Sequence, residues 1–222
     1  MDQATNSFTL LNLFYDGGGW MYPLLLCSLF AVGVIIAKAF ALWAAHRESK
    51  TILEEVETLI HAGKVNEAVA RCEETPGPVA AILLAGLRRV QEEDYRTNDV
   101  EQAVKTTGTI ELGFLERGLP ILATISNVAP LLGFLGTVAG MISAFAAIEL
   151  AGQVEATLVA GGIKVALITT ATGLLIAVPV NISYNFFVTR IDKLIVDMEQ
   201  GAAKILALVW ELADRRAAAA RI

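Results

Sequence analysis

The hydrophobic positions of the chain fall into three long blocks, and charged segments lie between and after them. The middle block covers residues 119–148 and contains no charged side chain. The other two blocks cover residues 20–45 and 163–189, and each has a single lysine near one end. About 17–25 apolar residues are enough for a helix to cross a bilayer. The pattern therefore predicts an all-α integral membrane protein with three transmembrane helices.

The charged segments have the period of helices, and no segment has the alternation of a strand. In residues 46–118 the apolar positions recur every three or four residues, and Gly63 and Pro76 interrupt the pattern. Residues 190–222 carry an apolar stripe that predicts an amphipathic helix, formed by Ile191, Leu194, Ile195, Met198, Ile205, Leu206 and Val209. We therefore expect long helical extensions of the spans, with residues 46–118 continuing into the second span.

The distribution of lysine and arginine predicts the orientation of the chain in the membrane. Residues 1–19 and the loop at 149–162 contain neither, whereas residues 46–118 contain nine and residues 190–222 contain six. Loops rich in these residues stay on the cytoplasmic side. The N-terminus is therefore expected outside and both large charged segments in the cytoplasm. We expect Lys38 to extend its ammonium to the interface along an apolar stem, and the alternative is a buried ion pair.

Two of the predicted spans carry a narrow face of small and hydroxyl-bearing residues, when positions are plotted at about 100° per residue. In the second span this face consists of Ser126, Pro130, Gly133, Thr137, Gly140 and Ala144. In the third span it consists of Ala166, Thr170, Gly173, Ala177 and Asn181, with Asn185 nearby. A helix that faces only lipid has no need of such a face.

Two interpretations of these faces compete. The first is close helix packing, in which small residues let two backbones approach; the residues concerned are Gly133, Gly136, Gly140, Gly173, Pro130 and Pro179. The second is a pore wall or partner-facing wall, because polar groups within a membrane usually face protein or a cavity; its candidates are Thr137, Thr170, Asn181, Ser126 and Thr169. Spacing alone favours neither interpretation.

The predicted spans contain no Asp, Glu or His. A proton relay or a sodium site generally needs an ionisable or strongly coordinating group. If this chain moves ions, the titrating carboxylate is expected from another subunit. The remaining possibilities are a path of hydroxyls and carbonyls or no transport at all. Lys164, at the end of the third span, is either an interfacial anchor or an electrostatic gate.

Composition supports a membrane protein and gives no support to catalysis or nucleic-acid binding. The chain is 55% hydrophobic, with a mean hydropathy of +0.58 and a net charge of −6. There is no basic patch, no phosphate-binding loop and no Ser/His/Asp arrangement. We therefore expect no enzyme activity, no cofactor and no metal site. Cys72, in a charged segment, is expected to be a packed thiol rather than a reactive one.

Two stretches resemble the ExbB/TolQ/MotA family of ion-driven motor subunits. They are APLLGFLGTVAGMISAF at Ala129–Phe145 and GIKVALITTATGLLIAVPVNISYN at Gly162–Asn185. The start of the first span and the HAGKVNEAVARC segment also fit, so the resemblance covers about residues 15 to 205. The order and separation of the stretches are closer to the three-span ExbB/TolQ branch than to four-span flagellar stators.

The resemblance implies an architecture and a mechanism. It implies a pentamer in the bacterial inner membrane around a pore that holds two copies of a single-span ExbD/TolR-like partner. A membrane Asp of that partner would titrate, and proton or sodium flow would drive one ring against the other to do work on the cell envelope. Thr137 and Thr170 match the family's pore threonines, which face the partner's Asp.

One position departs from the family pattern. Many proton-driven members have a Glu near the start of the third-span motif, where this chain has Val165. The hydroxyl of Thr169 beside Thr170 could suit sodium, so the driving ion stays open. A different class of function is a membrane scaffold without ion flux, in which the polar faces are packing seams.

Overall fold

The computed structural model describes residues 10–92 and 96–219, and all regular elements among them are helices. They are α1 (Leu10–Asp16), the short 3₁₀ helix η2 (Gly18–Trp20), α2 (Met21–His61), α3 (Val65–Glu74), α4 (Pro78–Val90), α5 (Thr97–Glu116), α6 (Leu119–Ala151) and α7 (Ala156–Ala219). Three helical stretches, Gly18–Ala45, Thr97–Ala151 and Val159–Glu211, contain windows long and apolar enough to cross a membrane. The predicted all-α fold with three spans is therefore confirmed.

The chain divides into two compact units. The first, which we call the membrane unit, comprises Met1–Ala37 and Gly118–Phe186. The second, which we call the polar unit, comprises Lys38–Arg117 and Phe187–Ile222. The helices α2 and α7 each contribute one part to each unit, because neither is interrupted at the boundary.

Helix lengths explain why the spans extend beyond the apolar blocks. The helix α7 has 64 residues, so it is roughly 96 Å long at 1.5 Å per residue. The hydrocarbon core of a bilayer is only about 30 Å thick. The sequence predicted a third span followed by a separate amphipathic helix near Arg190, and the structure instead joins both into one helix.

The second span begins at a break in the chain. The helix α5 ends at Glu116, and Gly118 has a φ of +90° before α6 begins at Leu119. That left-handed conformation costs a glycine little, whereas other residues are strained by it. The segment 46–118 therefore does not continue into the second span as one unbroken helix. Earlier in this segment, α4 ends at Val90, and Gln91 and Glu92 after it are a turn and a bend.

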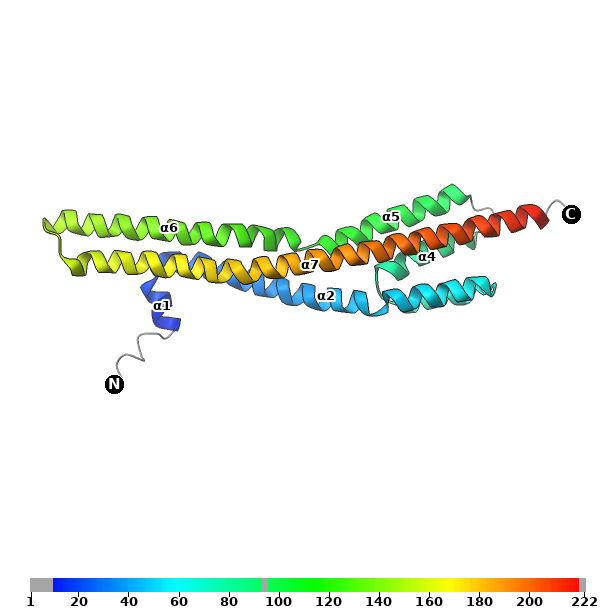
Figure 1. Cartoon of the computed structure of the whole chain (residues 1–222), viewed down its shortest axis with the longest axis horizontal. Coiled ribbons are helices and arrows are strands. Elements are labelled where there is room, and N and C mark those ends of the chain that lie inside the picture. The colour runs from blue at the N-terminus through cyan, green and yellow to red at the C-terminus, as the bar shows by residue number, and fades with distance from the viewer. Residues whose placement is uncertain (1–9, 93–95, 220–222) are drawn as a thin grey trace. The chain divides into compact units, whose positions relative to one another are not determined.

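In the membrane unit, α6 runs beside the first part of α7 along the stripes of small residues (Figure 1). Their outward faces are large and apolar, as lipid or neighbouring membrane helices require. Exposed members include Leu131, Phe134, Ile142, Leu167, Leu175 and Ile182.

The polar unit has its own apolar core. A Cβ atom added at Gly86 of α4 would lie 2.9 Å from Cγ1 of Ile205 and 3.2 Å from Cγ2 of Val104. Three helices thus meet closely at this glycine. The most buried core side chains of the unit include Ile52, Val56, Val79, Leu83, Leu87, Val100, Leu194, Ile205 and Val209.

Lys38 is buried in the polar unit rather than extended toward solvent. It is 7% exposed, and its Nζ donates a hydrogen bond of 2.5 Å to the carbonyl oxygen of Leu115. Leu115 lies in the last turn of α5, where carbonyl groups have no partner within the helix. The expectation that the ammonium reaches the interface is therefore wrong for this chain; it caps a helix end instead.

Candidate functional site

The candidate site is the seam between α6 and α7 in the membrane unit. The stripe predicted on the second span faces α7 of the same chain. Its members Gly133, Gly140 and Ala144 are buried, as is the neighbouring Gly136. Across the seam Ala166, Thr169, Gly173 and Ala177 are buried as well.

Glycine is required along this seam because the two backbones touch. A Cβ atom at Gly133 would lie 2.9 Å from the carbonyl oxygen of Thr169. One at Gly173 would lie 2.6 Å from the carbonyl oxygen of Ala129. Backbone atoms cannot move aside as a flexible side chain can. These glycines therefore set the separation of α6 and α7, as small residues do in membrane helix pairs.

Thr137 and Thr170 meet at the middle of the seam. Their hydroxyl oxygens are in hydrogen-bond contact with each other, and either atom can be the donor. The hydroxyl of Thr137 is also 3.2 Å from the carbonyl oxygen of Ala166, and that of Thr170 is 3.2 Å from the carbonyl oxygen of Gly133. Both side chains are half-buried. The structure therefore brings together two threonines that are 33 positions apart in the chain.

These hydroxyls keep some hydrogen-bonding capacity for a group from another molecule. Each has one proton to donate and two lone pairs to accept. The pair and its two carbonyl neighbours use the two protons but only some of the lone pairs. A neutral acid could donate a hydrogen bond to the free lone pairs, and a cation could be held by them. A carboxylate would accept a hydrogen bond from a threonine only after that hydroxyl turned away from its present partner. The site thus suits a group that changes its protonation state.

Two other candidates are turned toward their own helices. Thr169 is completely buried, and its hydroxyl is 3.0 Å from the carbonyl oxygens of both Val165 and Ala166. The hydroxyl of Ser126 donates to the carbonyl of Ala123 over 2.9 Å, and the residue is 8% exposed. Neither hydroxyl lies on an open face of the single chain.

Asn181 lies on an exposed part of α7, and its side-chain oxygen accepts a hydrogen bond of 2.8 Å from Asn185. The two prolines lie inside the helices, Pro130 in α6 and Pro179 in α7. A proline removes one helix hydrogen bond. The hydroxyl of Ser183 donates to the carbonyl of Pro179 over 2.8 Å.

At one end of the seam, Lys164 is paired with a residue from the start of the chain. Its Nζ lies 2.6 Å from Oδ2 of Asp16, the last residue of α1. Sequence reasoning identified Lys164 and missed its partner, because the two residues are 148 positions apart and no periodicity relates them. It also missed Gly162, where an added Cβ would collide with the carbonyl oxygen of Gly140.

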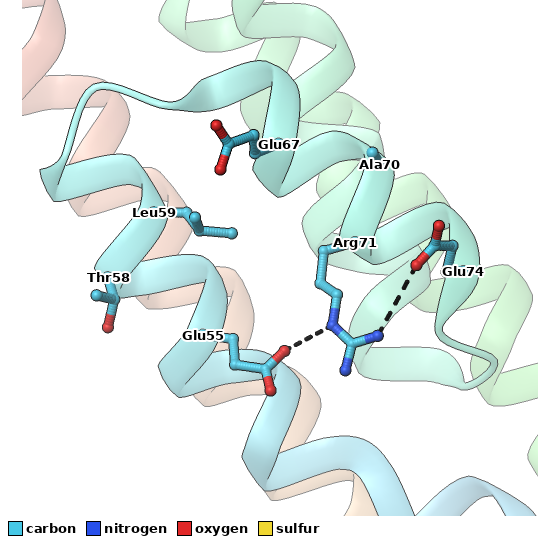
Figure 2. A pocket seen from close by; sticks show the side chains of 7 residues that line it. All are labelled: Glu55, Thr58, Leu59, Glu67, Ala70, Arg71 and Glu74. Carbon is cyan, nitrogen blue, oxygen red and sulfur yellow. Dashed lines mark hydrogen bonds and ion pairs between the residues drawn. The ribbon is translucent and has the colours of Figure 1, made fainter.

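The polar unit has a surface cleft of about 560 Å³ between α2 and α3. Figure 2 shows Arg71 between the carboxylates of Glu55 and Glu74, which line the cleft. Its Nε lies 2.7 Å from Glu55, and its Nη1 lies 4.0 Å from Glu74. Among the described residues, no group of three or more His, Cys, Asp or Glu side chains could hold a metal ion. The cleft is therefore a surface groove lined by ion pairs.

Cys72 lies on α3 and is buried. Burial raises the pKa of its thiol to about 11, with smaller opposing effects from Arg71 and Glu73. A thiol with this pKa is almost wholly protonated at neutral pH, so it is a weak nucleophile. The residue therefore belongs to the packed core of the polar unit.

Comparison with known proteins places the seam inside a matched region. Residues 74–200 match the sequence profile of the MotA/TolQ/ExbB proton channel family. An ExbB homolog of Methanothermobacter thermautotrophicus, described as a biopolymer transport protein, is 31% identical over 195 residues, which cover 86% of this chain and 68% of that protein. The Tol-Pal system protein TolQ of Pseudomonas aeruginosa is 32% identical over 163 residues, covering 68% and 71%. TolQ of Haemophilus influenzae is 29% identical over 174 residues, covering 74% and 76%.

Proposed function

The chain belongs to the MotA/TolQ/ExbB proton channel family, and from this we propose that it is the channel-forming subunit of an ion-driven motor in the bacterial inner membrane. Protons are the driving ion we favour, as the name of the family states. The motor converts the ion gradient into mechanical work on the cell envelope. The N-terminus lies outside, and the polar unit lies in the cytoplasm.

The hydroxyl pair of Thr137 and Thr170 carries this proposal. It places two hydroxyl groups in contact across the middle of the seam between α6 and α7. The sequence has no acidic residue between Leu119 and Ile148 or between Ile163 and Phe187. Two threonines alone cannot release and rebind a proton at physiological pH. The chain therefore supplies solvation to a titrating group that must come from elsewhere.

We propose that this group is an Asp in the single membrane helix of an ExbD/TolR-like partner. An ion from outside neutralises the Asp, and the threonine hydroxyls accept a hydrogen bond from the neutral acid. When the ion leaves to the cytoplasm, the same hydroxyls donate to the carboxylate. The change in charge alters the preferred position of the partner helix, and this drives its movement relative to the surrounding subunits. Five copies of this chain around two partner helices are the assembly that the family relationship favours.

The experiment replaces one hydroxyl with a methyl group. Thr170→Val keeps the volume of the side chain and removes its hydrogen bonds. We expect loss of ion-driven work in cells, and loss of ion uptake by proteoliposomes that contain the co-purified complex. Thr172→Val is the matched control, because its hydroxyl bonds only to the carbonyl of Ile168 on its own helix.

A second candidate function is a membrane scaffold without ion flux. The observation that favours it is that both hydroxyls already find partners within the chain. If the seam only holds helices together, Thr170→Val should reduce the amount of assembled complex. The complex that still assembles should then support the same cellular work as the wild type. If the motor proposal is correct, native mass spectrometry of Thr170→Val should show an unchanged complex that no longer conducts. Full activity in an intact Thr170→Val complex would overturn the motor role of the pair.

A further inference from the structure

The membrane unit has one positive side chain in its whole sequence. Residues 1–37 and 118–186 contain Lys164 and no other lysine, no arginine and no histidine. The ammonium of Lys164 lies 2.6 Å from the carboxylate of Asp16. The single cation of this unit is therefore matched by a carboxylate from the N-terminal segment.

Several contacts hold Asp16 in this place. The ring of Phe14 packs edge-on against Tyr22, with centroids 5.2 Å apart. Gly17 follows Asp16, and a Cβ atom at Gly17 would lie 2.5 Å from Cγ of Met21 and 3.2 Å from Cγ2 of Ile168. The turn after α1 is thus packed closely against both α2 and α7. Asp16 reaches Lys164 from a fixed position rather than from a loose tail.

Stability does not explain the pair. The side chain of Lys164 is 55% exposed and that of Asp16 is 34% exposed. Exposed ion pairs contribute little to folding, because water and salt screen them. Electric fields at the end of an ion path act differently, since a positive side chain there repels passing cations. The pair therefore has a larger consequence for ion passage than for folding.

We propose that Asp16 is the counter-charge that neutralises Lys164, and that this neutralisation lets cations pass the end of the α6–α7 seam. Lys164 precedes Thr170 by six residues, or roughly 9 Å along the helix axis. It is about 120° around the helix from Thr170, so it acts through its field rather than by contact. This separation is close to the Debye length of about 8 Å at physiological salt.

The inference rests on the proposed function, because it requires that cations pass along the seam. It does not depend on the orientation of the chain, since a positive charge opposes cations at an entrance and at an exit alike. Asp16 acts through Lys164, whose positive charge it offsets, and does not itself bind the passing ion. Two other carboxylates, Glu149 and Glu155, lie at the same end of the membrane unit. Glu155 accepts hydrogen bonds from Gln153 and Thr157.

The test measures ion uptake by proteoliposomes that contain this chain with its co-expressed partner. A potassium diffusion potential drives uptake, and a pH-sensitive dye reports protons. The variants are Asp16→Asn, Lys164→Gln and the double variant, with Glu155→Gln as the matched control that removes a carboxylate not bound to Lys164. Native mass spectrometry checks that each complex is assembled.

Asp16→Asn should lower uptake on the order of tenfold at low ionic strength, which is the lower end of electrostatic effects on rates. The loss should shrink in about 1 M salt, where the Debye length is about 3 Å. Lys164→Gln in the Asp16→Asn background should restore uptake, and Glu155→Gln should leave it unchanged. A purely structural anchor would show neither the salt effect nor the rescue.

Uptake by Asp16→Asn equal to that of the wild type would overturn the inference. A double variant as inactive as Asp16→Asn would also overturn it, because the loss would then come from a displaced α1 rather than from charge. Failure of the proposed function has a different signature: the wild type would carry no more ions than Thr170→Val. That result would reject ion passage, and the role of Asp16 with it.

Discussion

The backbones of Gly140 on α6 and Gly162 on α7 are in contact. A Cβ atom at Gly140 would lie 2.6 Å from the carbonyl oxygen of Gly162 and 3.0 Å from the amide nitrogen of Ala166. No rearrangement of side chains can relieve a collision with backbone atoms. The separation of the two helices at this end of the membrane unit therefore depends on the absence of two methyl groups.

Gly140→Ala should destabilise the membrane unit. The added methyl group forces α6 away from α7, and overpacking of this kind costs about 1–3 kcal/mol. Thermal unfolding of the purified protein in detergent should show a lower melting temperature. Gly161→Ala is the matched control, because a Cβ atom at Gly161 meets nothing within 4 Å. Equal melting temperatures for both variants would contradict the close contact.

Lys38→Met should destabilise the polar unit. The change leaves the carbonyl group of Leu115, which now receives a hydrogen bond of 2.5 Å, without its charged donor. A buried carbonyl that loses its partner costs about 1–3 kcal/mol. Lys105→Met removes a lysine that is 73% exposed and paired with Glu101, and it should change stability by less than about 0.5 kcal/mol. Chemical unfolding followed by circular dichroism measures the free energy of unfolding of both variants. Equal values for Lys38→Met and Lys105→Met would show that Lys38 does not stabilise the end of α5.

Cys72 should resist alkylation at moderately alkaline pH. With a pKa of about 11, only about one thiol in a thousand is ionised at pH 8, against roughly a quarter for an ordinary thiol of pKa near 8.5. A water-soluble maleimide should therefore modify Cys72 roughly a hundred times more slowly than Ala70→Cys, an exposed position on the same helix, in a background without Cys72. Mass spectrometry over time measures both rates. Similar rates would show that Cys72 is not enclosed.

The same pKa predicts how stability depends on pH. Because the folded state holds the thiol proton more tightly than the unfolded chain, folding is favoured fully below the unfolded pKa of about 8.5. The advantage is lost as pH rises from there through about 11. A Cys72→Ala variant should lack this part of the alkaline loss. If Cys72→Ala loses stability with rising pH as steeply as the wild type, groups other than Cys72 cause the alkaline loss of stability.

Much of the fold follows from local pattern. Apolar blocks of spanning length predicted three transmembrane helices, and Gly63 and Pro76 lie at the breaks that bound α3. The family resemblance, drawn from the stretches Ala129–Phe145 and Gly162–Asn185, is confirmed by the profile match. Each of these inferences needs only residues close together in the chain. Helix continuity at Arg190 and the break at Gly118 were less predictable, because packing decides whether a weak local signal becomes a boundary.

The seam shows where local pattern stops. Spacing placed Thr137 and Thr170 on small-residue faces of two helices, and it left open whether those faces meet each other or a pore. In the structure they meet each other, and the pore role of the threonines stays a proposal. Thr169, a candidate for the ion path, is fully enclosed between the helices. Its neighbour Thr170, which the spacing placed on the small-residue face, is only half-buried.

The sequence by itself determined the class of protein, the number of spans and the absence of Asp, Glu and His from those spans. Hydropathy and composition express these properties directly, because transfer into a bilayer depends on each residue's own chemistry. Tertiary structure alone decided that Asp16 pairs with Lys164, that Lys38 caps α5, and that Gly140 touches Gly162. Such pairings join positions far apart in the chain. They exist only when the packed helices bring those residues within a few ångströms, and no periodicity along the chain encodes that distance.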